Sequence, residues 1–414
     1  MKLSFLKKYL LLYISSLSSM YCFAETLPVD WHSMRAMGMG ESFTAFSNDE
    51  TAIYANPAGL SSTRNPASKK AISDIKFPDF EIGANELMLN NMKANPLEWG
   101  TDLINAAKNT PGKQSYLELQ SFPEIIFGGK FAPTFMIGFP IRSENKVAFL
   151  DTANPNNAYT ISTTTATAAI AISNATQRGG FRYGLSIRPN YRTDYQNSTM
   201  DTTHVTSTND LTSEITKNGI QTTSVGIDAG LMFTAADYWF PTLGIAVRNI
   251  PTGCINTYKN PVTQNTENIC GAIRQGGTDT SPNTSKIDPT ELRIGLSLTP
   301  RGKVAKSKVN LRLSVDVYPI PVSFGGNNYG VKDVDLNRLL HAGAELYFGK
   351  VLIQQGFSIR GGYMEGGATW GISINAAFLS IDYSSYVIND SLPVNSTTQT
   401  FVERRHLLGL SCHW

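Results

Sequence analysis

The chain has 414 residues, of which 16% are charged and 41% are hydrophobic, and its formal net charge at pH 7 is +2. Charged residues are scarcer than the roughly 25% of ordinary soluble domains, and small polar residues and 34 glycines take their place. Beyond the N-terminus no apolar run approaches the about 20 residues of a spanning helix, which argues against a helical membrane protein. The near-zero net charge argues against a nucleic-acid-binding protein, and the 10% aromatic content argues against disorder.

The first 24 residues have the layout of a secretory signal peptide. Three lysines precede a mostly apolar stretch, and Ala24 supplies a small residue before a cleavage site at Glu25. We therefore expect residues 1–24 to be removed on export. An N-terminal anchor helix is the alternative, although the apolar part is short for a membrane span.

Three cysteines remain in the mature chain. Cys254 and Cys270 flank a stretch rich in Gly, Asn and Thr, and in an exported protein such a pair is predicted to form a disulfide within a loop. Cys412 alternates with apolar residues near the C-terminus, so it is predicted to be a small lipid-facing residue of the last strand.

Apolar and polar residues alternate with a period of two through most of the mature chain. In residues 291–299, four leucine or isoleucine side chains alternate with Arg, Gly, Ser and Thr, and residues 181–188, 224–233 and 309–317 show the same pattern. The polar row is rich in Gly, Ser and Arg, which is typical of a barrel lumen rather than of a sandwich face in bulk water. The segments reach the about 9 to 11 residues that cross an outer membrane.

The alternation predicts fourteen strands, near residues 74–83, 116–129, 134–150, 158–173, 180–195, 221–235, 240–250, 290–300, 308–318, 339–349, 355–365, 368–377, 379–387 and 401–414. The connections form two alternating sets: one set is short, and the other contains every long connection, namely residues 84–115, 196–220, 251–289, 319–338 and 388–400. Bacterial outer-membrane barrels have an even strand number, short periplasmic turns and long extracellular loops. We therefore predict an all-β fold, in which residues 71–414 form a transmembrane antiparallel β-barrel of about 14 strands.

Pro78 and Pro140 lie inside two of these predicted strands. At Pro78 the apolar phase switches from Phe77 to Phe80, which predicts a β-bulge. Gly138 and Pro140 interrupt another strand, where proline removes a backbone donor from the ladder. Either an ordinary bulge or strand end lies there, or an opening in the barrel wall.

The segment ahead of the barrel carries the most specific motif. It contains Arg35-Ala36, then Gly38-Met39-Gly40, then Ala52-Ile-Tyr-Ala-Asn56-Pro57-Ala-Gly59-Leu60. This stretch resembles the N-terminal region of the FadL-type long-chain fatty acid transporters and of their PorV-type relatives. Glu41-Ser42 departs from the family pattern, in which two small residues are common. Shorter matches recur in order toward the C-terminus, around His341, Arg360 and Arg405.

The resemblance implies that residues 25–70 form a hatch in the barrel lumen, on its periplasmic side. Its characteristic residues would be Gly38, Gly40, Asn56, Pro57 and Gly59. Glycine allows close backbone approach, and a fourteen-stranded barrel leaves room for such a plug. A permanent brace and a movable gate are both compatible with the sequence.

The alternation of side chains along each strand also predicts which charged residues face the lumen. The candidates for binding a ligand there are Arg182, Arg188, Arg293, Arg312, Arg360 and Arg405. Either these arginines form ion pairs with inward-facing acidic residues, or they bind an anionic head group through the bidentate geometry of guanidinium. In the loop over residues 85–109, a broken amphipathic pattern around Pro96 predicts two short helices. By the resemblance these would form a hydrophobic groove, and the alternative is a cap over the barrel mouth.

No pattern supports catalysis. The five histidines lack metal-ligand spacing, and neither a Gly-x-Ser-x-Gly elbow nor a phosphate loop is present, so we expect no enzymatic activity, metal or cofactor. A barrel hydrolase with dispersed Ser and His stays an open alternative.

The sequence therefore predicts an outer-membrane protein, in contact with membrane lipid, that passively transports hydrophobic small molecules such as long-chain fatty acids. The alternative is a PorV-like protein that holds an outer-membrane or secreted protein partner. An apolar lining between hatch and strands would favour transport. A lumen filled by salt bridges, with loops folded outward, would favour the partner-holding role.

Overall fold

The computed structural model describes thirteen stretches of the chain. They are residues 31–63, 72–128, 133–151, 154–176, 179–205, 207–259, 265–276, 287–300, 309–330, 336–350, 355–376, 378–394 and 397–414. The predicted signal peptide over residues 1–24 and both ends of the predicted hatch, 25–30 and 64–70, lie outside these stretches.

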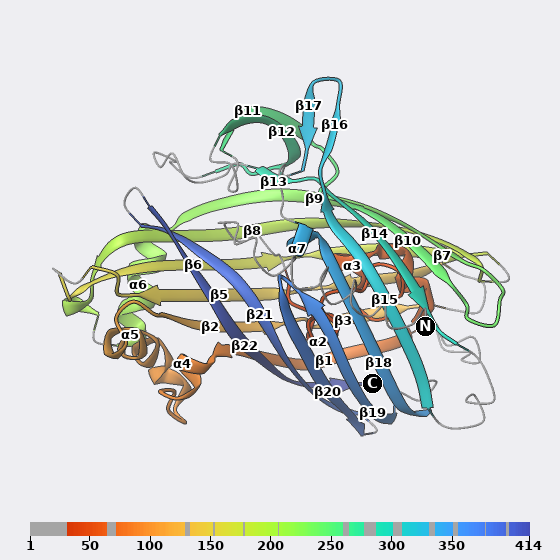
Figure 1. The fold of residues 1–414 in the computed structure, drawn as a ribbon, viewed down its shortest axis with the longest axis horizontal. Coiled ribbons are helices and arrows are strands. Elements are labelled where there is room, and N and C mark those ends of the chain that lie inside the picture. Colours follow the sequence, from red (N-terminus) through yellow and green to blue (C-terminus); the bar gives the residue numbers. More distant parts are fainter. Residues whose placement is uncertain are drawn as a thin grey trace, which may run out of the picture.

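Seventeen strand segments form one closed antiparallel sheet (Figure 1). They are β1 Ile72–Asn85, β2 Gln114–Ser121, β3 Glu124–Phe127, β4 Thr134–Gly138, β5 Ile141–Ala148, β6 Asn157–Thr167, β7 Ala169–Ala175, β8 Phe181–Asp201, β9 Ile220–Thr234, β10 Thr242–Arg248, β14 Glu291–Leu298, β15 Val309–Ile320, β18 Leu340–Lys350, β19 Gln355–Met364, β20 Gly367–Ala376, β21 Leu379–Val394 and β22 Thr397–His413. The pairs β2 and β3, β4 and β5, and β6 and β7 are halves of single interrupted strands, so the barrel has fourteen strands. The last strand, β22, pairs with β1 and closes the barrel. The prediction of a fourteen-stranded antiparallel barrel is confirmed.

The alternation of side chains matches the predicted faces. In β8, Phe181, Tyr183, Leu185 and Ile187 are exposed on the outside, whereas Arg188 on the inward row is completely buried. The predicted bulge in β1 is present, because the register with β22 shifts between Lys76 and Asp79. The apolar row therefore forms the lipid-facing surface, and the polar row faces the lumen.

Exposed aromatic residues gather at the end of the barrel with short turns. Tyr238 and Trp239 lie exposed in the turn between β9 and β10. The rings of Phe378 and Trp414 stack with their centroids 5.6 Å apart. Such a band of aromatic side chains is typical of the membrane interface of outer-membrane barrels.

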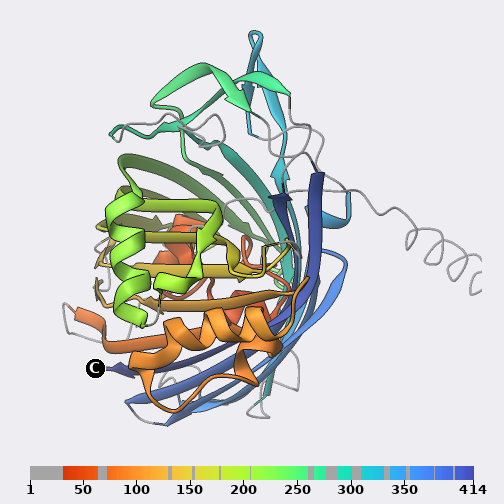
Figure 2. The same cartoon turned by 90° about the vertical axis from the view of Figure 1, so that its left-hand side faces the viewer.

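Figure 2 shows the helices of two long connections at one end of the barrel, and their contacts place them on the outside of the wall. The predicted helical loop forms α4 Glu86–Leu89, the short 3₁₀ helix η2 Pro96–Glu98 and α5 Trp99–Asn109, and the next long loop forms η3 Thr202–His204 and α6 Thr208–Asn218. Leu103 of α5 and Leu211 of α6 are buried in one apolar cluster with the outward-facing Leu117 and Val147. The helices thus cover the outer face of the strand ends, whereas a cap over the mouth would contact the inward-facing row.

Two other long connections join into a second sheet. Its five strands are β11 Gly253–Lys259, β12 Thr266–Ile273, β13 Ile287–Pro289, β16 Val322–Phe324 and β17 Asn327–Tyr329. Cys254 and Cys270 face each other across β11 and β12 and are joined by a disulfide. Thr223 of β9 and Gln275 exchange two backbone hydrogen bonds of 2.7 and 2.8 Å, which fasten this disulfide-linked hairpin to the barrel.

The predicted long loop over residues 388–400 is wrong. The ladder between β21 and β22 continues from Leu379 opposite Cys412 to Val394 opposite Thr397. Its Asn, Asp, Ser and Pro residues suggest a turn, but the pairing beyond the membrane needs no apolar alternation. A short helix, α7 Leu336–Leu339, precedes β18. Among the described helices, none is long and apolar enough to cross a membrane.

Candidate functional site

The N-terminal segment, residues 31–63, lies inside the barrel (Figure 1). It forms α2 Met34–Gly38, α3 Ala52–Ala55 and the 3₁₀ helix η1 Pro57–Ser62. Ser33 caps α2 by accepting a hydrogen bond from the amide of Ala36. Gly40 has a φ of 62°, and its backbone lies against that of Tyr363. This conformation is unfavourable for residues other than glycine.

Asn56 explains the Asn-Pro part of the motif. Its side-chain oxygen accepts from the amide of Ala58 at 3.1 Å and caps η1, with Pro57 in the first turn. Its side-chain nitrogen donates to the carbonyl of Thr44 at 2.9 Å and to that of Leu231 in β9 at 3.1 Å. One side chain therefore closes a helix end and ties the segment to the wall.

Inward-facing glycines on eight barrel strands form a seat for the N-terminal segment, which we call the glycine seat. They are Gly184, Gly230, Gly244, Gly295, Gly343, Gly362, Gly371 and Gly409. A Cβ added at any of them would come within 3.2 Å of an atom of the segment. The sequence interpretation missed this seat, although its signal is visible as a glycine in the inward row of successive strands.

Replacing Gly362 by alanine is therefore expected to destabilise the seated segment. The new Cβ would overlap backbone atoms of Met39 and Gly40, and overpacking of this kind costs about 1–3 kcal/mol. Urea-induced unfolding in lipid vesicles would measure the loss, and entry of a large antibiotic into cells would report leakage through the unseated lumen.

Gly361 provides the matched control, because it is the preceding residue and faces the lipid. A Cβ there meets only the carbonyl of Thr369, at 4.0 Å. Gly361→Ala should leave both stability and leakage unchanged. Equal effects of the two substitutions would refute the seat.

Ion pairs also hold the N-terminal segment against the barrel wall. Arg35 donates to both carboxylate oxygens of Glu345, at 2.9 and 2.6 Å, and Glu345 also accepts from Arg312 and Arg360. On the opposite wall, Glu50 accepts from Lys76 of β1 at 2.9 Å. Burial raises the pKa of Glu50, but the charges of Lys76 and His413 and the hydrogen bonds to Glu50 together outweigh burial and lower this pKa to about 2.

Five of the six candidate lumen arginines have carboxylate partners. The pairs are Arg188 with Asp228, Arg293 with Glu291, Arg312 with Glu345, Arg360 with Glu345 and Asp382, and Arg405 with Asp390 and Glu403. Arg182 instead donates to the hydroxyls of Ser62 and Thr234. The arginines are thus engaged chiefly in structural pairs.

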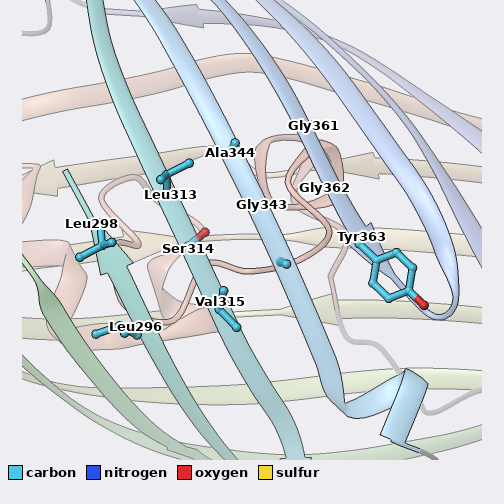
Figure 3. A pocket seen from close by; sticks show the side chains of 11 residues that line it. Leu296, Leu298, Leu313, Ser314, Val315, Gly343, Ala344, Gly361, Gly362 and Tyr363 are labelled. Carbon is cyan, nitrogen blue, oxygen red and sulfur yellow. The ribbon is translucent and has the colours of Figure 1, made fainter. Parts of the chain in front are cut away.

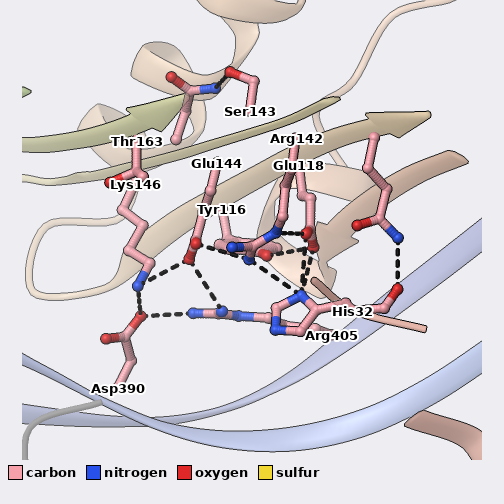
Figure 4. Close-up of polar contacts among 12 residues, drawn as sticks. His32, Tyr116, Glu118, Arg142, Ser143, Glu144, Lys146, Thr163, Asp390 and Arg405 are labelled. Atoms are coloured by element: carbon pink, nitrogen blue, oxygen red, sulfur yellow. Dashed lines mark hydrogen bonds and ion pairs between the residues drawn. The ribbon is translucent and has the colours of Figure 1, made fainter. Parts of the chain in front are cut away.

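A second network connects buried polar side chains on the inner face of the barrel (Figure 4). Its members come from the N-terminal segment, β2, β5, β21 and β22, and they are His32, Tyr116, Glu118, Arg142, Glu144, Lys146, Asp390 and Arg405. The His32 ring nitrogen lies 3.0 Å from the carboxylate of Glu118, and Arg142 donates to Glu144 at 2.8 Å. The network joins the N-terminal segment to neighbouring strands on one side of the barrel, and the buried charges compensate one another by pairing.

Asp74, His413 and Ser411 have the connectivity of a hydrolytic triad. His413 lies 3.0 Å from Asp74 through Nδ1 and 3.2 Å from the Ser411 hydroxyl through Nε2. Asp74 belongs to the first strand of the barrel, and Ser411 and His413 belong to the last, which pairs with it. These contacts therefore tie the two ends of the barrel sheet together.

Apolar side chains fill the space between the N-terminal segment and strands β3, β4 and β7. The cluster contains Trp31, Ala52, Ile53, Tyr54, Leu60, Phe122, Ile126, Met136, Ala169 and Ala171. The ring centroids of Trp31 and Phe122 are 5.2 Å apart, and those of Trp31 and Tyr54 are 5.9 Å apart. The Phe122 ring lies against Gly138, where a Cβ would not fit. We call this group the aromatic cluster.

The barrel wall is interrupted directly beside this cluster. β2 and β3 separate at Pro123, β4 and β5 separate at Pro140, and β6 and β7 separate at Ala168. Single backbone hydrogen bonds bridge the breaks, from Phe139 to Pro123, from Thr167 to Pro140, and from Ala168 to Pro189. Proline offers no backbone donor, so three prolines in neighbouring strands thin the ladder at one level.

A groove of about 730 Å³ lies on the outer face of the wall at this level. Phe139, Ile141, Ala168 and Val225 contribute to its lining from the wall, and Gln275 does so from the disulfide-linked hairpin. We call it the wall groove. The sequence located one element of it, the strand break at Gly138 and Pro140.

Comparison with known proteins gives a likeness in structure alone. No protein-family model and no curated protein matches the chain. The deltaS2 mutant of the TodX monoaromatic hydrocarbon channel matches with a TM-score of 0.52 and 10% identity, over 94% of this chain and all of that one (100%). The chain therefore shares the barrel fold of this channel. A Pseudomonas aeruginosa FadL homologue is also similar, with a TM-score of 0.44 and 11% identity over 95% of this chain and 99% of that chain.

The barrel has another depression on its lipid-facing surface, of about 410 Å³ (Figure 3). Leu296, Val315, Ala344 and Tyr363 are among the residues that line it. Behind it the ladders from β14 to β19 run on without a chain break. It therefore offers a matched comparison for the wall groove.

Within the part of the chain that the structure describes, no group of three or more His, Cys, Asp or Glu residues is placed to hold a metal ion.

Proposed function

We propose that this outer-membrane barrel passively transports hydrophobic small molecules, and that they leave the lumen sideways through the interrupted wall. The supporting observation is the coincidence of three features at one level: the aromatic cluster inside, the strand breaks at Pro123 and Pro140, and the wall groove outside. An apolar molecule would meet apolar side chains on both sides of the weakest part of the ladder.

In this proposal the N-terminal segment acts as a fixed hatch. The glycine seat, the Arg35–Glu345 pair and the Asn56 hydrogen bonds hold it against many strands. Moving it would break buried charge pairs, each with a substantial penalty. A sideways route needs no such movement, which favours the brace over the gate.

Uptake by intact cells tests the proposal. Cells without hydrophobic-compound channels of their own would express the protein, and initial uptake of a radiolabelled fatty acid, an alcohol and an aromatic hydrocarbon would be compared with the empty vector. We expect uptake of at least one class to rise several-fold. A folded, surface-expressed barrel that leaves all three rates at the vector level would contradict transport.

A disulfide crosslink between the hatch and the barrel wall, tested in the same uptake assay, distinguishes a fixed brace from a movable gate. The hydroxyls of Ser42 and Ser314 lie 2.7 Å apart, so Ser42→Cys and Ser314→Cys can form a disulfide in a Cys412→Ser background. Uptake should be equal in the oxidised and reduced protein. Loss of uptake on oxidation, restored by reduction, would show that the hatch must move.

The alternative, a PorV-like protein that holds a protein partner, also has a supporting observation. Salt bridges fill much of the lumen, the loop helices fold outward, and Phe324 is 78% exposed at the end of β16 in the second sheet. A stoichiometric protein that copurifies in mild detergent, without any rise in uptake, would favour this role. The apolar lining beside the hatch favours transport, and we retain transport as the conclusion.

A further inference from the structure

The position of the wall groove in the bilayer follows from β8. Its outward-facing apolar side chains begin at Phe181 and end at Tyr191. At about 3.3 Å per residue and a tilt of about 40°, these ten steps span about 25 Å, the height of the lipid-facing band of such barrels. Tyr191, which lines the wall groove, therefore marks the rim of this band toward the long loops.

The lining of the wall groove is apolar toward the membrane core and hydrogen-bonding at the rim. Phe139, Ile141 and Val225 present exposed hydrocarbon, whereas Thr252 and Gln275 come from the hairpin above. The Gln275 backbone is held by its two hydrogen bonds to Thr223. The hairpin thus places an exposed amide side chain over an apolar floor.

None of the described residues that line the wall groove carries a charge. Arg274 lies between two lining residues in the sequence, and its guanidinium donates to Asp288 at 2.8 Å and to Asp194 at 3.3 Å. Arg142 and Arg188 also adjoin lining residues, but both are buried on the lumen side and paired with Glu144 and Asp228. Arg192 is likewise paired with Asp194, at 2.7 Å. A carboxylate entering the groove would lose water without gaining a free cation.

We infer that the wall groove is a binding site for a neutral amphiphile, a molecule with an apolar body and an uncharged hydrogen-bonding head such as a hydroxyl or carbonyl. The body lies on the floor formed by Phe139, Ile141 and Val225, and the head meets Thr252 and Gln275 at the rim. This inference rests on the proposed function, since it names the chemical class that leaves through the wall. It selects neutral cargo over the carboxylate of a fatty acid.

Photolabelling of the full-length protein in lipid nanodiscs tests the inference. The two probes are an aliphatic alcohol with a diazirine in its chain and the carboxylic acid of the same chain length, the latter kept ionised at alkaline pH. Mass spectrometry would locate the labelled peptides. We expect the alcohol to label residues 139–141 and 189–191 at least about fivefold more than the acid does, because the groove offers hydrogen bonds but no cation. Equal labelling, or stronger labelling by the acid, would overturn the inference.

Two further arms make the result specific. Gln275→Leu should lower labelling by the alcohol and leave labelling by a diazirine-bearing alkane unchanged, and an equal loss for both probes would contradict the role of the amide.

Uptake measured on the same proteins distinguishes the neutral-amphiphile site from the proposed transport function. If cells take up hydrophobic compounds but the groove stays unlabelled by the alcohol, the neutral-amphiphile site is wrong and transport stands. If uptake also fails, the proposed function falls with it.

Discussion

Ala168→Trp is expected to reduce uptake of hydrophobic compounds to roughly a tenth or less, because the indole occupies a large area of the wall groove. Ala168 lies exposed on the outer face at the break between β6 and β7, so the larger side chain can be added without disturbing the lumen. The ladder remains as it is, and only the outer side of the interruption is filled. Initial uptake rates at matched surface expression measure the effect.

Ala344→Trp is the control for bulk on the lipid-facing wall. Ala344 lines the second depression, where the ladders behind it are continuous (Figure 3). This variant should transport at the rate of the unmodified protein. If both tryptophans slow uptake equally, or neither does, molecules do not leave through the wall groove.

Arg188→Leu is expected to lower the free energy of unfolding by about 3–5 kcal/mol, since it leaves a buried carboxylate without its hydrogen-bonded cation. Arg188 is completely buried, donates to both carboxylate oxygens of Asp228 at 2.6 and 3.0 Å, and lies 5.2 Å from the ring centre of Tyr54. Asp228 keeps hydrogen bonds from Ser186 and from the amide of Asn249, but these carry no positive charge. Urea-induced unfolding in lipid vesicles measures the change.

Two variants show whether the buried charge is the cause. Arg192→Leu removes another inward-facing arginine from the same strand, whose side chain is 20% exposed and whose partner Asp194 also binds Arg274. It should cost about 1 kcal/mol or less. The double variant Arg188→Leu with Asp228→Leu should regain most of the lost stability, because an apolar pair of similar size replaces the buried ion pair. A double variant as unstable as Arg188→Leu alone would exclude this cause.

The strands were predictable because each repeats a local physical condition. A barrel strand places one row of side chains in lipid and the next in the lumen. The same alternation appears in the sequence of the strands, as in Leu292 to Leu298. Outside the membrane that condition ends. Residues 388–394 continue a strand with a turn-like composition, so the sequence predicted a loop where pairing with β22 decided otherwise.

The candidate site was predictable only in part. Asn56, Gly40 and Gly59 belong to a continuous motif, so the sequence located the segment that contacts the wall. The glycine seat is spread over residues 184 to 409 and becomes one feature only when the register aligns the strands. The sequence predicted a strand break at Pro140. The structure was needed to show that Pro123 and Pro189 lie beside this break in neighbouring strands.

The lumen arginines were likewise predictable only in part from the sequence. Parity alone placed Arg188, Arg312 and Arg405 inside the barrel, because a side chain two residues along a strand returns to the same face. Their partners lie on other strands or in the N-terminal segment, as Asp228 and Glu345 do. The choice between structural pairs and a free anionic site therefore required distances between carboxylates and guanidinium groups.

The sequence by itself determined the barrel, its strand number, the inward and outward rows and the N-terminal segment, since each follows from local alternation or from a continuous motif. Only the tertiary structure decided that the helices lie outside the wall, that glycines on eight strands seat the segment, and that three prolines align beside the aromatic cluster and the wall groove. These features depend on register between strands, and register is set by pairing around the whole closed sheet rather than by any one segment.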